Sequence, residues 1–321
     1  MTTHAIRIHE TGGPEVLKWE PIEVGEPARG EARVRHEAIG LNFIDVYHRT
    51  GLYPTALPAI VGTEASGVVE AVGEGVKDLA PGDRVAYATG PLGGYAEVRT
   101  MPASVLVKLP PKVEHRTAAA VMLKGLTAHY LAEMTSTVAS RPTVLVHAAA
   151  GGVGSLLTQW LAHRGATVIG TVGSEEKAKL AREHGCAHVI VYRHEDVVAR
   201  VKEIGLVDVV YDSIGKDTFM SSLDCLRPRG LMVSFGQSSG PAPPIDPRLL
   251  SQKGSLFLTR PKLADYAQGV ELQARARELF EAIASGTLRV SIPQAYPLRD
   301  AAQAHADLEA RKTTGSTVLL P

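Results

Sequence analysis

The chain has 321 residues, of which 45% are hydrophobic and 21% charged, and Lys plus Arg equals Asp plus Glu at 34 each. This length predicts one large or two ordinary domains, and the balanced charge gives no reason to expect a polyanionic partner such as nucleic acid. No apolar run approaches the roughly 18 residues of a membrane span, and the N-terminus lacks the apolar core of a secretion signal. With only Cys186 and Cys225 we expect no disulfide framework, and predict a cytoplasmic protein with two reduced structural thiols.

Residues 1–110 are rich in Gly and Pro and contain short β-type runs, including "EARVRHEAIGLN", "ASGVVEAVG", "DRVAYA" and "YAEVRT". Turn signals recur at a spacing of about 8–12 residues, which is typical of a β-rich domain of barrel or roll kind. From about residue 118 the pattern changes, and "TAAAVMLKGLTAHYLAEMT" has the apolar spacing of a helix.

Strands and helices then alternate, beginning with "TVLVHA", "GSLLTQWLAHRG", "TVIGTV" and "SEEKAKLAREHG". They continue with strands "HVIVY", "VDVVYDSI" and "LMVSFG" and helices "EDVVARVKEIG" and "TFMSSLDCLRPRG". This alternation predicts an α/β domain with a doubly wound parallel sheet. After Pro261 comes a further helix, and the closing "STVLLP" predicts a strand that could return to the first domain and make it discontinuous.

A glycine-rich turn joins the first of these strands to its helix. It has the sequence Ala149-Ala150-Gly151-Gly152-Val153-Gly154, in which Ala149 replaces the first glycine of the dinucleotide fingerprint. Free backbone N–H groups and the helix dipole at such a turn attract a pyrophosphate. We expect Gly151 to let the backbone approach the phosphates and Gly154 to let the helix pack closely on its strand.

The end of the second strand distinguishes the two nicotinamide dinucleotides. An acidic residue there would bind the ribose 2′-OH of NAD, but this chain has Gly173 and Ser174. Ser174 can donate to a phosphate oxygen and is also a candidate helix N-cap, and Lys177 follows in the first helical turn. Glu175 and Glu176 argue weakly against this interpretation and are expected to point to solvent. The pattern favours NADPH.

Several stretches resemble a known family: "LNFIDVYHRTGLYP", "GTEASGVVEAVGEGV", "GGYAEV", "AAAVMLKGLTAHYL", "VLVHAAAGGVGSLLTQWLA", "LDCLRPRGLMVSFGQSSG" and "GSLFLTRP". They are similar to the NADPH-dependent quinone oxidoreductases, the zeta-crystallin-like, zinc-free branch of the medium-chain dehydrogenases/reductases. The resemblance implies a GroES-like catalytic domain over 1–121 and 264–321, with a Rossmann NADPH-binding domain over 122–263 inserted into it. It also implies a homodimer that pairs through the Rossmann sheets.

The resemblance also has implications for zinc binding and for the type of reaction. Zinc-dependent relatives have a cysteine ligand where this chain has Asn42, and a histidine within the segment that here is Gly62-Thr63-Glu64, so we predict no metal. Without a Lewis acid, alcohol oxidation is unattractive, whereas a quinone in the interdomain cleft accepts a hydride, or single electrons, readily. Donors near the quinone oxygen would stabilise the product anion, and the candidates are Asn42, Tyr47 and Tyr53. Tyr47 is the first choice, and the alternative for either tyrosine is a purely structural core role.

Further cofactor contacts follow from the resemblance, and Asp45 is expected to be structural, orienting Asn42 or the loop. The implied phosphate contacts are Ala150, Gly151, Gly152, Val153 and Gly154, with Gly173, Ser174, Lys177, Tyr192 and Arg311 on the adenosine side. The implied contacts near the nicotinamide or along its cleft are Asn42, Lys124, Thr127, Ser213, Gly215, Phe235, Gly236, Gln237, Leu258 and Arg260, because ligands bind beyond the carboxyl ends of parallel strands.

Two competing functions remain open at this point. The first is an NADPH-dependent reductase of α,β-unsaturated carbonyls, since the hydride chemistry is similar. The second is a non-catalytic, crystallin-like protein that binds NADPH or RNA. For RNA the sequence offers no basic run and only 5% aromatic residues.

Overall fold

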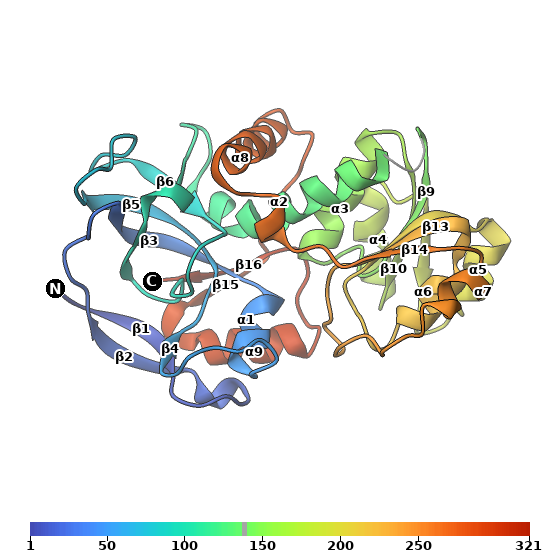
Figure 1. The fold of residues 1–321 in the computed structure, drawn as a ribbon, viewed down its shortest axis with the longest axis horizontal. Helices are drawn as coiled ribbons and strands as arrows, with labels where there is room; N and C mark the ends of the chain where they lie inside the picture. Colours follow the sequence, from blue (N-terminus) through green and yellow to red (C-terminus); the bar gives the residue numbers. More distant parts are fainter. Residues whose placement is uncertain (137–139) are drawn as a thin grey trace. The chain divides into compact units, whose positions relative to one another are not determined.

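The computed structural model describes residues 1–136 and 140–321, which form two compact units (Figure 1). Unit 1 consists of Met1–Leu126, Tyr266–Gly286 and Val290–Pro321, and unit 2 of Thr127–Asp265 and Thr287–Arg289. The long helix α2 (His115–Ser136) contains the first division between the two units. The domain limits predicted from the sequence were residues 121 and 264.

Unit 1 contains the β-rich part of the chain. Its larger sheet has the strand order β15-β16-β3-β5-β6-β8, with β7 also paired to β3, and a smaller antiparallel sheet has the order β2-β1-β4. The strands are β1 (Thr2–Ile8), β2 (Lys18–Glu23), β3 (Glu31–Leu41), β4 (Ala59–Ile60), β5 (Glu64–Val72), β6 (Arg84–Tyr87), β7 (Val98–Pro102), β8 (Val107–Lys108), β15 (Gln294–Pro297) and β16 (Thr317–Leu320).

Strand β3 organises the larger sheet. Exposed or half-buried and buried residues alternate along its first part, as in a strand with one solvated face, but its last four residues are all buried. There it lies between β5 and the C-terminal strand β16, with Thr317 opposite Leu41 (Figure 1). The expected return of the closing strand to the first domain is therefore confirmed. The chain leaves this buried end of β3 directly into Asn42.

Three helices complete the description of unit 1: α1 (Phe43–Arg49), α8 (Gly269–Ala284) and α9 (Ala301–Glu309). Helix α9 has alanines at three of its first four positions, and its buried residues Ala301, Ala304 and His305 follow a helical spacing. The first two of these pack in the main core of the unit with strand residues such as Val34 and Leu319. This packing brings His305, from near the end of the chain, into the interior.

Unit 2 contains a six-stranded parallel sheet of order β11-β10-β9-β12-β13-β14. Its central strands are almost wholly buried, as expected when helices cover both faces. The strands are β9 (Thr143–Val146), β10 (Thr167–Val172), β11 (His188–Val191), β12 (Val207–Asp212), β13 (Leu226–Ser234) and β14 (Phe257–Thr259). The helices are α3 (Gly152–His163), α4 (Glu175–Glu183), α5 (Val197–Ile204), α6 (Phe219–Asp224) and α7 (Arg248–Gln252).

One predicted helix was too long. We expected a helix over "TFMSSLDCLRPRG", but α6 ends at Asp224 and β13 begins at Leu226. Pro228 has no N–H to donate to a helix and favours an extended backbone before it, and Arg229 has a left-handed φ of 63°. The register between β12 and β13 shifts at the same point, so the segment enters the sheet through an irregularity.

Candidate active site

The cofactor residues predicted in unit 2 gather mainly at one edge of its sheet. The sheet order runs from β9 through β10 to β11 on one side and from β9 through β12 to β14 on the other, so the order reverses beside β9. Crevices outside the carboxyl ends of strands at such a point bind dinucleotides. The segments that follow the carboxyl ends of β9, β10, β11, β12, β13 and β14 contain Ala150–Gly154, Gly173–Ser174, Tyr192, Ser213, Phe235–Gln237 and Arg260, respectively.

The glycine turn after β9 is tight because one of its glycines, Gly154, has no room for a side chain. A Cβ at Gly154 would overlap the carbonyl oxygen of Ala148, so α3 packs directly on the turn, as predicted. The turn is closed by a bond from the Gly151 N–H to Ala148 O (2.8 Å), and Ala148 itself has a left-handed φ of 53°. Ala149 is accommodated by Gly170 of β10, where a Cβ would lie 2.8 Å from the Ala149 side chain. The glycine missing from the fingerprint is thus compensated on the neighbouring strand.

Helix α3 presents a phosphate-binding terminus. Gly151 is its N-cap with an extended backbone, and no side chain caps the helix. The N–H groups of Gly152, Val153 and Gly154 belong to the first turn, which has no intrahelical acceptors, and Ala150 precedes them in the same loop. A Cβ at Gly151 would make one tight contact, at 3.1 Å from Ala148 O, and its only other neighbour within 4 Å would be the Ala148 side chain. These residues fit a pyrophosphate.

The adenosine-side residues after β10 and β11 are brought together. A Cβ at Gly173 would lie 2.7 Å from the Tyr192 hydroxyl, and Tyr192 is 40% exposed. Ser174 is the N-cap of α4 and accepts the Lys177 N–H at 3.4 Å, so its predicted capping role is confirmed. A hydrogen bond from Ser174 lowers the pKa of Glu176, so this exposed carboxylate already holds the Ser174 hydroxyl.

A 2′-phosphate would have to replace the Glu176 carboxylate as the acceptor of the Ser174 hydroxyl proton. From the sequence, Glu176 was expected only to point to solvent. Lys177 lies in the first turn of α4, and its positive charge towards this phosphate stays a prediction. The Gly173 position, with no acidic side chain at the end of β10, also fits the phosphorylated form of the cofactor.

The loops after β12 and β13 contact each other. A Cβ at Gly236 would lie 2.5 Å from Ser213 O, and the N–H groups of Phe235 and Gly236 both donate to Asp212 O at 2.9 and 3.2 Å. Arg260 donates to Ser234 O at 2.7 Å, which ties the end of β14 to the same loop. These segments, with Gln237 and the left-handed Gly215 (φ 88°), form one continuous backbone surface beyond the sheet.

Three other predicted cofactor residues lie outside the loops described above, either elsewhere in the sequence or in the other unit. Thr127 is buried in α2, and Leu258 is 37% exposed in the edge strand β14 beside Met232. Arg311 follows α9 with a left-handed φ of 59° and belongs to unit 1, whereas the adenosine-side residues belong to unit 2. The implied contacts of these side chains stay predictions.

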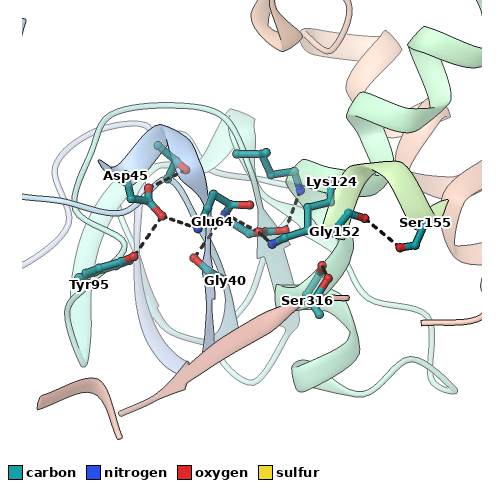
Figure 2. A network of polar contacts seen from close by, with 12 residues as sticks. Gly40, Asp45, Glu64, Tyr95, Lys124, Gly152, Ser155 and Ser316 are labelled. Atoms are coloured by element: carbon teal, nitrogen blue, oxygen red, sulfur yellow. Dashed lines mark hydrogen bonds and ion pairs between the residues drawn. The ribbon is translucent and has the colours of Figure 1, made fainter. Parts of the chain in front are cut away.

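A buried polar cluster lies at the end of β3 in unit 1 (Figure 2). The Glu64 carboxylate is fully buried and accepts from Asn42 Nδ2 (2.8 Å), Leu123 N (2.7 Å) and Lys124 Nζ (3.4 Å). It packs against Gly40, where a Cβ would overlap its carboxylate. A buried ion pair of this kind is tolerated only because further hydrogen bonds satisfy it. Asn42 and Lys124, two predicted nicotinamide-side residues, are thus held by one carboxylate that the prediction did not use.

Asp45 connects this cluster to a second chain of buried groups, part of which Figure 2 shows. As predicted, it orients Asn42: the Asn42 N–H donates to Asp45 Oδ2 at 2.9 Å, and the two form a capping box at α1. Tyr95 also donates to Oδ2 (3.1 Å), and Thr63 donates to Oδ1 (3.2 Å). Burial raises the pKa of Asp45 to about 7 against these hydrogen bonds.

The series of buried hydrogen bonds continues from Tyr95 to residues near the C-terminal end of the sequence. The Tyr95 hydroxyl is 2.9 Å from His305 Nε2, and Arg49 Nη1 is 3.1 Å from His305 Nδ1. Arg49 is 1% exposed and forms a bidentate pair with Glu309 at 2.8 and 2.9 Å. Burial, followed by the charge of Arg49, lowers the pKa of His305 to about 3, and burial raises the pKa of Tyr95 well above its usual range.

The two candidate tyrosines lie on and just after α1. Tyr47 is 8% exposed, and its ring packs at 5.2 Å from that of Tyr53 and at 6.3 Å from that of Phe43. Tyr53 is half-buried, and its ring lies edge-on to His48 at 5.6 Å. The structure brings the two predicted donors together, and their role towards a quinone oxygen stays a prediction.

Four residues of this network were not predicted from the sequence: Arg49, Tyr95, His305 and Glu309. Arg49 and Glu309 are 260 residues apart in the chain, and Tyr95 and His305 are 210 apart. The signal in the sequence was weak: a histidine among the alanines of "AAQAHADLE", on the apolar face of a helix.

Among the described residues, no three or more His, Cys, Asp or Glu side chains gather in a way that could hold a metal ion. In that same part of the chain, no helix combines the length and apolar character needed to span a bilayer. Cys186 and Cys225 are free and buried, and burial raises their thiol pKa values to about 11 and 12.

Family models match most of both units. The alcohol dehydrogenase GroES-like domain matches residues 28–111, and the zinc-binding dehydrogenase model matches residues 152–281. With a mixed β-sheet unit and a parallel sheet with a glycine turn, these matches define a medium-chain dehydrogenase/reductase built from GroES-like and Rossmann domains. The predicted fold class is confirmed.

Comparison with individual relatives assigns the chain to one family within this superfamily. The chain is 54% identical over 315 residues to quinone oxidoreductase of Pseudomonas aeruginosa, with 97% of each covered, and 47% identical to 2-haloacrylate reductase of Burkholderia sp, with 98% of each covered. The crystal structure of Escherichia coli quinone oxidoreductase complexed with NADPH matches with a TM-score of 0.97 at 48% identity, over 100% of both chains. This chain belongs to the quinone oxidoreductase family, a family of oxidoreductase enzymes, and the resemblance stated from its motifs is confirmed.

Proposed function

We propose that this enzyme reduces quinones with NADPH as its cofactor. The observation that carries the proposal is the similarity, over nearly the whole chain, to enzymes named quinone oxidoreductase, one of which was crystallised with NADPH. The residues present fit that cofactor: an uncapped helix terminus for the pyrophosphate, Ser174 and Lys177 at the start of α4, and Gly173 with the Tyr192 hydroxyl packed against it.

In this mechanism the bound nicotinamide supplies the hydride that the quinone accepts. The N–H groups of Gly152, Val153 and Gly154 bind the pyrophosphate, and Lys177 binds the 2′-phosphate as a charge-assisted partner. The loops of Ser213 and Gly236 line the cofactor surface, and holding the reactants in one orientation provides much of the rate.

The chain also acts on the quinone itself. The hydroxyls of Tyr47 and Tyr53, adjacent on α1 and the following turn, are our candidates for donors to the quinone oxygen as negative charge develops on it. The expected contact of Asn42 with the nicotinamide or the quinone stays a prediction, and we propose a positioning role for this residue as well. Its side chain is 5% exposed and donates to Glu64, so we assign it to positioning Lys124 and the start of α1.

The activity is tested by measuring the oxidation of NADPH and of NADH against 1,4-benzoquinone and 9,10-phenanthrenequinone, with and without a zinc chelator. We expect turnover with NADPH that the chelator does not change. Tight NADPH binding without quinone turnover would contradict the proposed reaction while leaving the cofactor assignment intact.

The 2′-phosphate assignment predicts a selective loss in a double variant. Ser174→Asp with Lys177→Ala should raise KM for NADPH at least about tenfold, because a charge-assisted contact of about 1.5–3 kcal/mol is lost. Asp is a good N-cap, so α4 should be preserved. The matched control is Lys179→Ala, an exposed lysine on the same helix, which should leave KM unchanged. An equal loss for NADH would contradict the assignment.

A second candidate reaction is the reduction of α,β-unsaturated carbonyl compounds. The relative named 2-haloacrylate reductase, 47% identical over 98% of this chain, is the observation that favours it. A haloacrylate is a conjugated alkene, to which a hydride also adds. Comparing kcat/KM for the two quinones with that for 2-alkenals and 2-chloroacrylate decides between the reactions, and we expect the quinones to be at least tenfold better.

We also propose that the enzyme is a homodimer that pairs through unit 2. The edge strand β14 leaves Phe257 61% exposed and Leu258 37% exposed, and an unpaired edge strand is a template for pairing with a second chain. Sedimentation equilibrium measures the mass directly, and a monomer at micromolar concentration would contradict this proposal.

A cytoplasmic location is part of the same proposal. Its support is chemical: both cysteines are free and buried, which suits a reducing compartment. Cell fractionation with a tagged chain tests the location, and recovery with the periplasmic or secreted fraction would contradict it.

A further inference from the structure

The buried hydrogen bonds around Asp45 have a fixed direction. Arg49 donates to Nδ1 of His305, and because a guanidinium only donates, that ring nitrogen is unprotonated. The lowered pKa of His305 keeps the ring neutral, so its one proton is on Nε2 and is donated to the Tyr95 hydroxyl. Tyr95 in turn donates its own proton to Oδ2 of Asp45.

This direction prevents the chain from delivering protons to Asp45. A proton taken from Tyr95 would have to be replaced through His305 by Arg49, whose guanidinium does not deprotonate in proteins. Oδ2 also accepts the Asn42 N–H, so donors already occupy it. The hydrogen bonds from Arg49 through His305 to Tyr95 therefore hold the Asp45 carboxyl group in place but do not deliver protons to it.

The other carboxyl oxygen of Asp45 faces a different kind of partner. In the part of the chain that the structure describes, Oδ1 is paired with the Thr63 hydroxyl, at 3.2 Å. A hydroxyl can donate to a carboxylate and accept from a carboxylic acid by rotating its proton. Asp45 is fully buried whereas Thr63 is half-buried, so Thr63 is the member of this pair that solvent reaches.

We propose that Asp45 stores the proton that quinone reduction consumes, and that the Thr63 hydroxyl is the catalytic group that passes it to the substrate. This inference rests on the proposed function. Addition of a hydride to a quinone leaves a hydroquinone monoanion with one charged oxygen. That oxygen takes the Thr63 hydroxyl proton, and Thr63 takes the proton from Oδ1 of Asp45. The products are a neutral hydroquinone and an Asp45 carboxylate, which solvent reprotonates through Thr63.

The electrostatics of the site agree with this geometry. Burial raises the pKa of Asp45 to about 7, so both protonation states are populated near neutral pH. Because the protonated form is the active one, turnover should fall as the pH rises through about 7. The titratable and charged groups that act on Asp45 or on its partner Tyr95 come from six segments of unit 1: Arg49 of α1, Glu64 of β5, Tyr87 of β6, Tyr95 before β7, Lys124 of α2 and His305 of α9.

The test compares Thr63→Val, which keeps the shape but removes the hydroxyl, with Thr63→Ser, which keeps the hydroxyl. We expect Thr63→Val to lower kcat with NADPH and 9,10-phenanthrenequinone about 100-fold at about pH 6 and to remove the fall near pH 7. Thr63→Ser should restore both. Unchanged NADPH affinity and an unchanged circular dichroism spectrum would show that the valine variant is folded.

A second readout does not depend on turnover. In the cofactor-free protein with ¹³C-labelled aspartate, one carboxyl resonance, absent in Asp45→Asn, should titrate near pH 7. Thr63→Val should raise that pKa, because the Thr63 hydrogen bond favours the carboxylate. Titration of Asp45 at an ordinary aspartate pKa would overturn the inference.

Two other outcomes separate this inference from the proposed function. If the wild type reduces quinones and Thr63→Val has the same kcat and pH profile, only the proton path is wrong. If the wild type reduces no quinone, the proposed function fails and proton delivery fails with it.

Discussion

The candidate functional residues of the two units differ in kind. In unit 2 the ligand surface is mainly backbone: the turn after β9, the start of α3 and the loops after β12 and β13. In unit 1 it is a network of buried side chains, in which Asp45, Glu64 and His305 are all fully buried. A backbone site depends on the absence of side chains, whereas a side-chain site depends on compensating buried charges.

This difference determines how each region should fail. In unit 2 a single added methyl group can meet backbone that has no room to move. In unit 1 an isosteric change that alters one proton or one hydrogen bond should change the pH response more than the packing. Each region can therefore serve as the internal reference for substitutions in the other.

The largest effect is expected at Gly154. Gly154→Ala should destabilise unit 2 by about 3 kcal/mol, because the new Cβ would overlap the carbonyl oxygen of Ala148 and α3 would have to move off its strand. Faster amide hydrogen exchange in β9 and α3, with unchanged exchange in β3, is the measurement. Exchange in unit 1 reports the reference region.

Gly151→Ala is the control for that prediction. Its Cβ would be 3.1 Å from the same oxygen, which a small adjustment relieves, so the stability should change by less than about 1 kcal/mol. The methyl group would instead face the pyrophosphate, so NADPH affinity should fall. Equal destabilisation by the two substitutions would contradict the distinct roles assigned to these glycines.

A smaller, pH-dependent effect is expected in unit 1. The pKa of His305 is lowered to about 3, so between about pH 3 and 6.5 the unfolded chain binds a proton that the folded one does not. Its contribution is fully present above pH 6.5 and is lost as the pH falls towards 3. His305→Gln, which can still accept from Arg49 and donate to Tyr95, should reduce the slope of stability against pH by about 1.4 kcal/mol per pH unit near pH 5.

Asp45 contributes with the opposite sign. Because its pKa is raised to about 7, the folded state holds an extra proton between about pH 4 and 7, and stability falls as the pH rises through that window. Urea unfolding at several pH values measures both slopes, with the exposed His163→Gln as control. An unchanged slope in His305→Gln would show that the buried ring is not neutral.

The same difference explains what the sequence could predict. The strand-to-helix turn at Gly151 and the cap at Ser174 are local patterns, in which residues a few positions apart determine the geometry. The parallel sheet followed from the alternation of buried runs, and the error at Leu226 came from reading "LDCLRPRG" as helix although Pro228 interrupts it.

The network of unit 1 was not predictable in this way. Asn42 and Asp45 were recognised through the family resemblance, and the structure joins them in one capping box. Arg49 and Glu309 are 260 residues apart, and their pairing depends on α9 packing against the first part of the chain. The side-chain pattern of α9 shows that His305 is buried, but not which groups it meets. Such contacts become visible only when the topology is known.

The smallest prediction compares two helix caps within unit 2. Ser174 accepts the Lys177 N–H at 3.4 Å and Asp196 accepts the Ala199 N–H at 2.7 Å, so Ser174→Ala should cost about 0.5 kcal/mol and Asp196→Ala about 1 kcal/mol. For NADPH affinity we expect the opposite ranking, with the larger loss in Ser174→Ala. Ser174→Ala should weaken it about threefold, the value of one modest hydrogen bond, whereas Asp196→Ala should leave it unchanged. Calorimetric titration with NADPH and hydrogen exchange at α4 and α5 measure the two quantities. If affinity instead followed the cap energies, the hydroxyl of Ser174 would act through the order of its helix rather than on the phosphate.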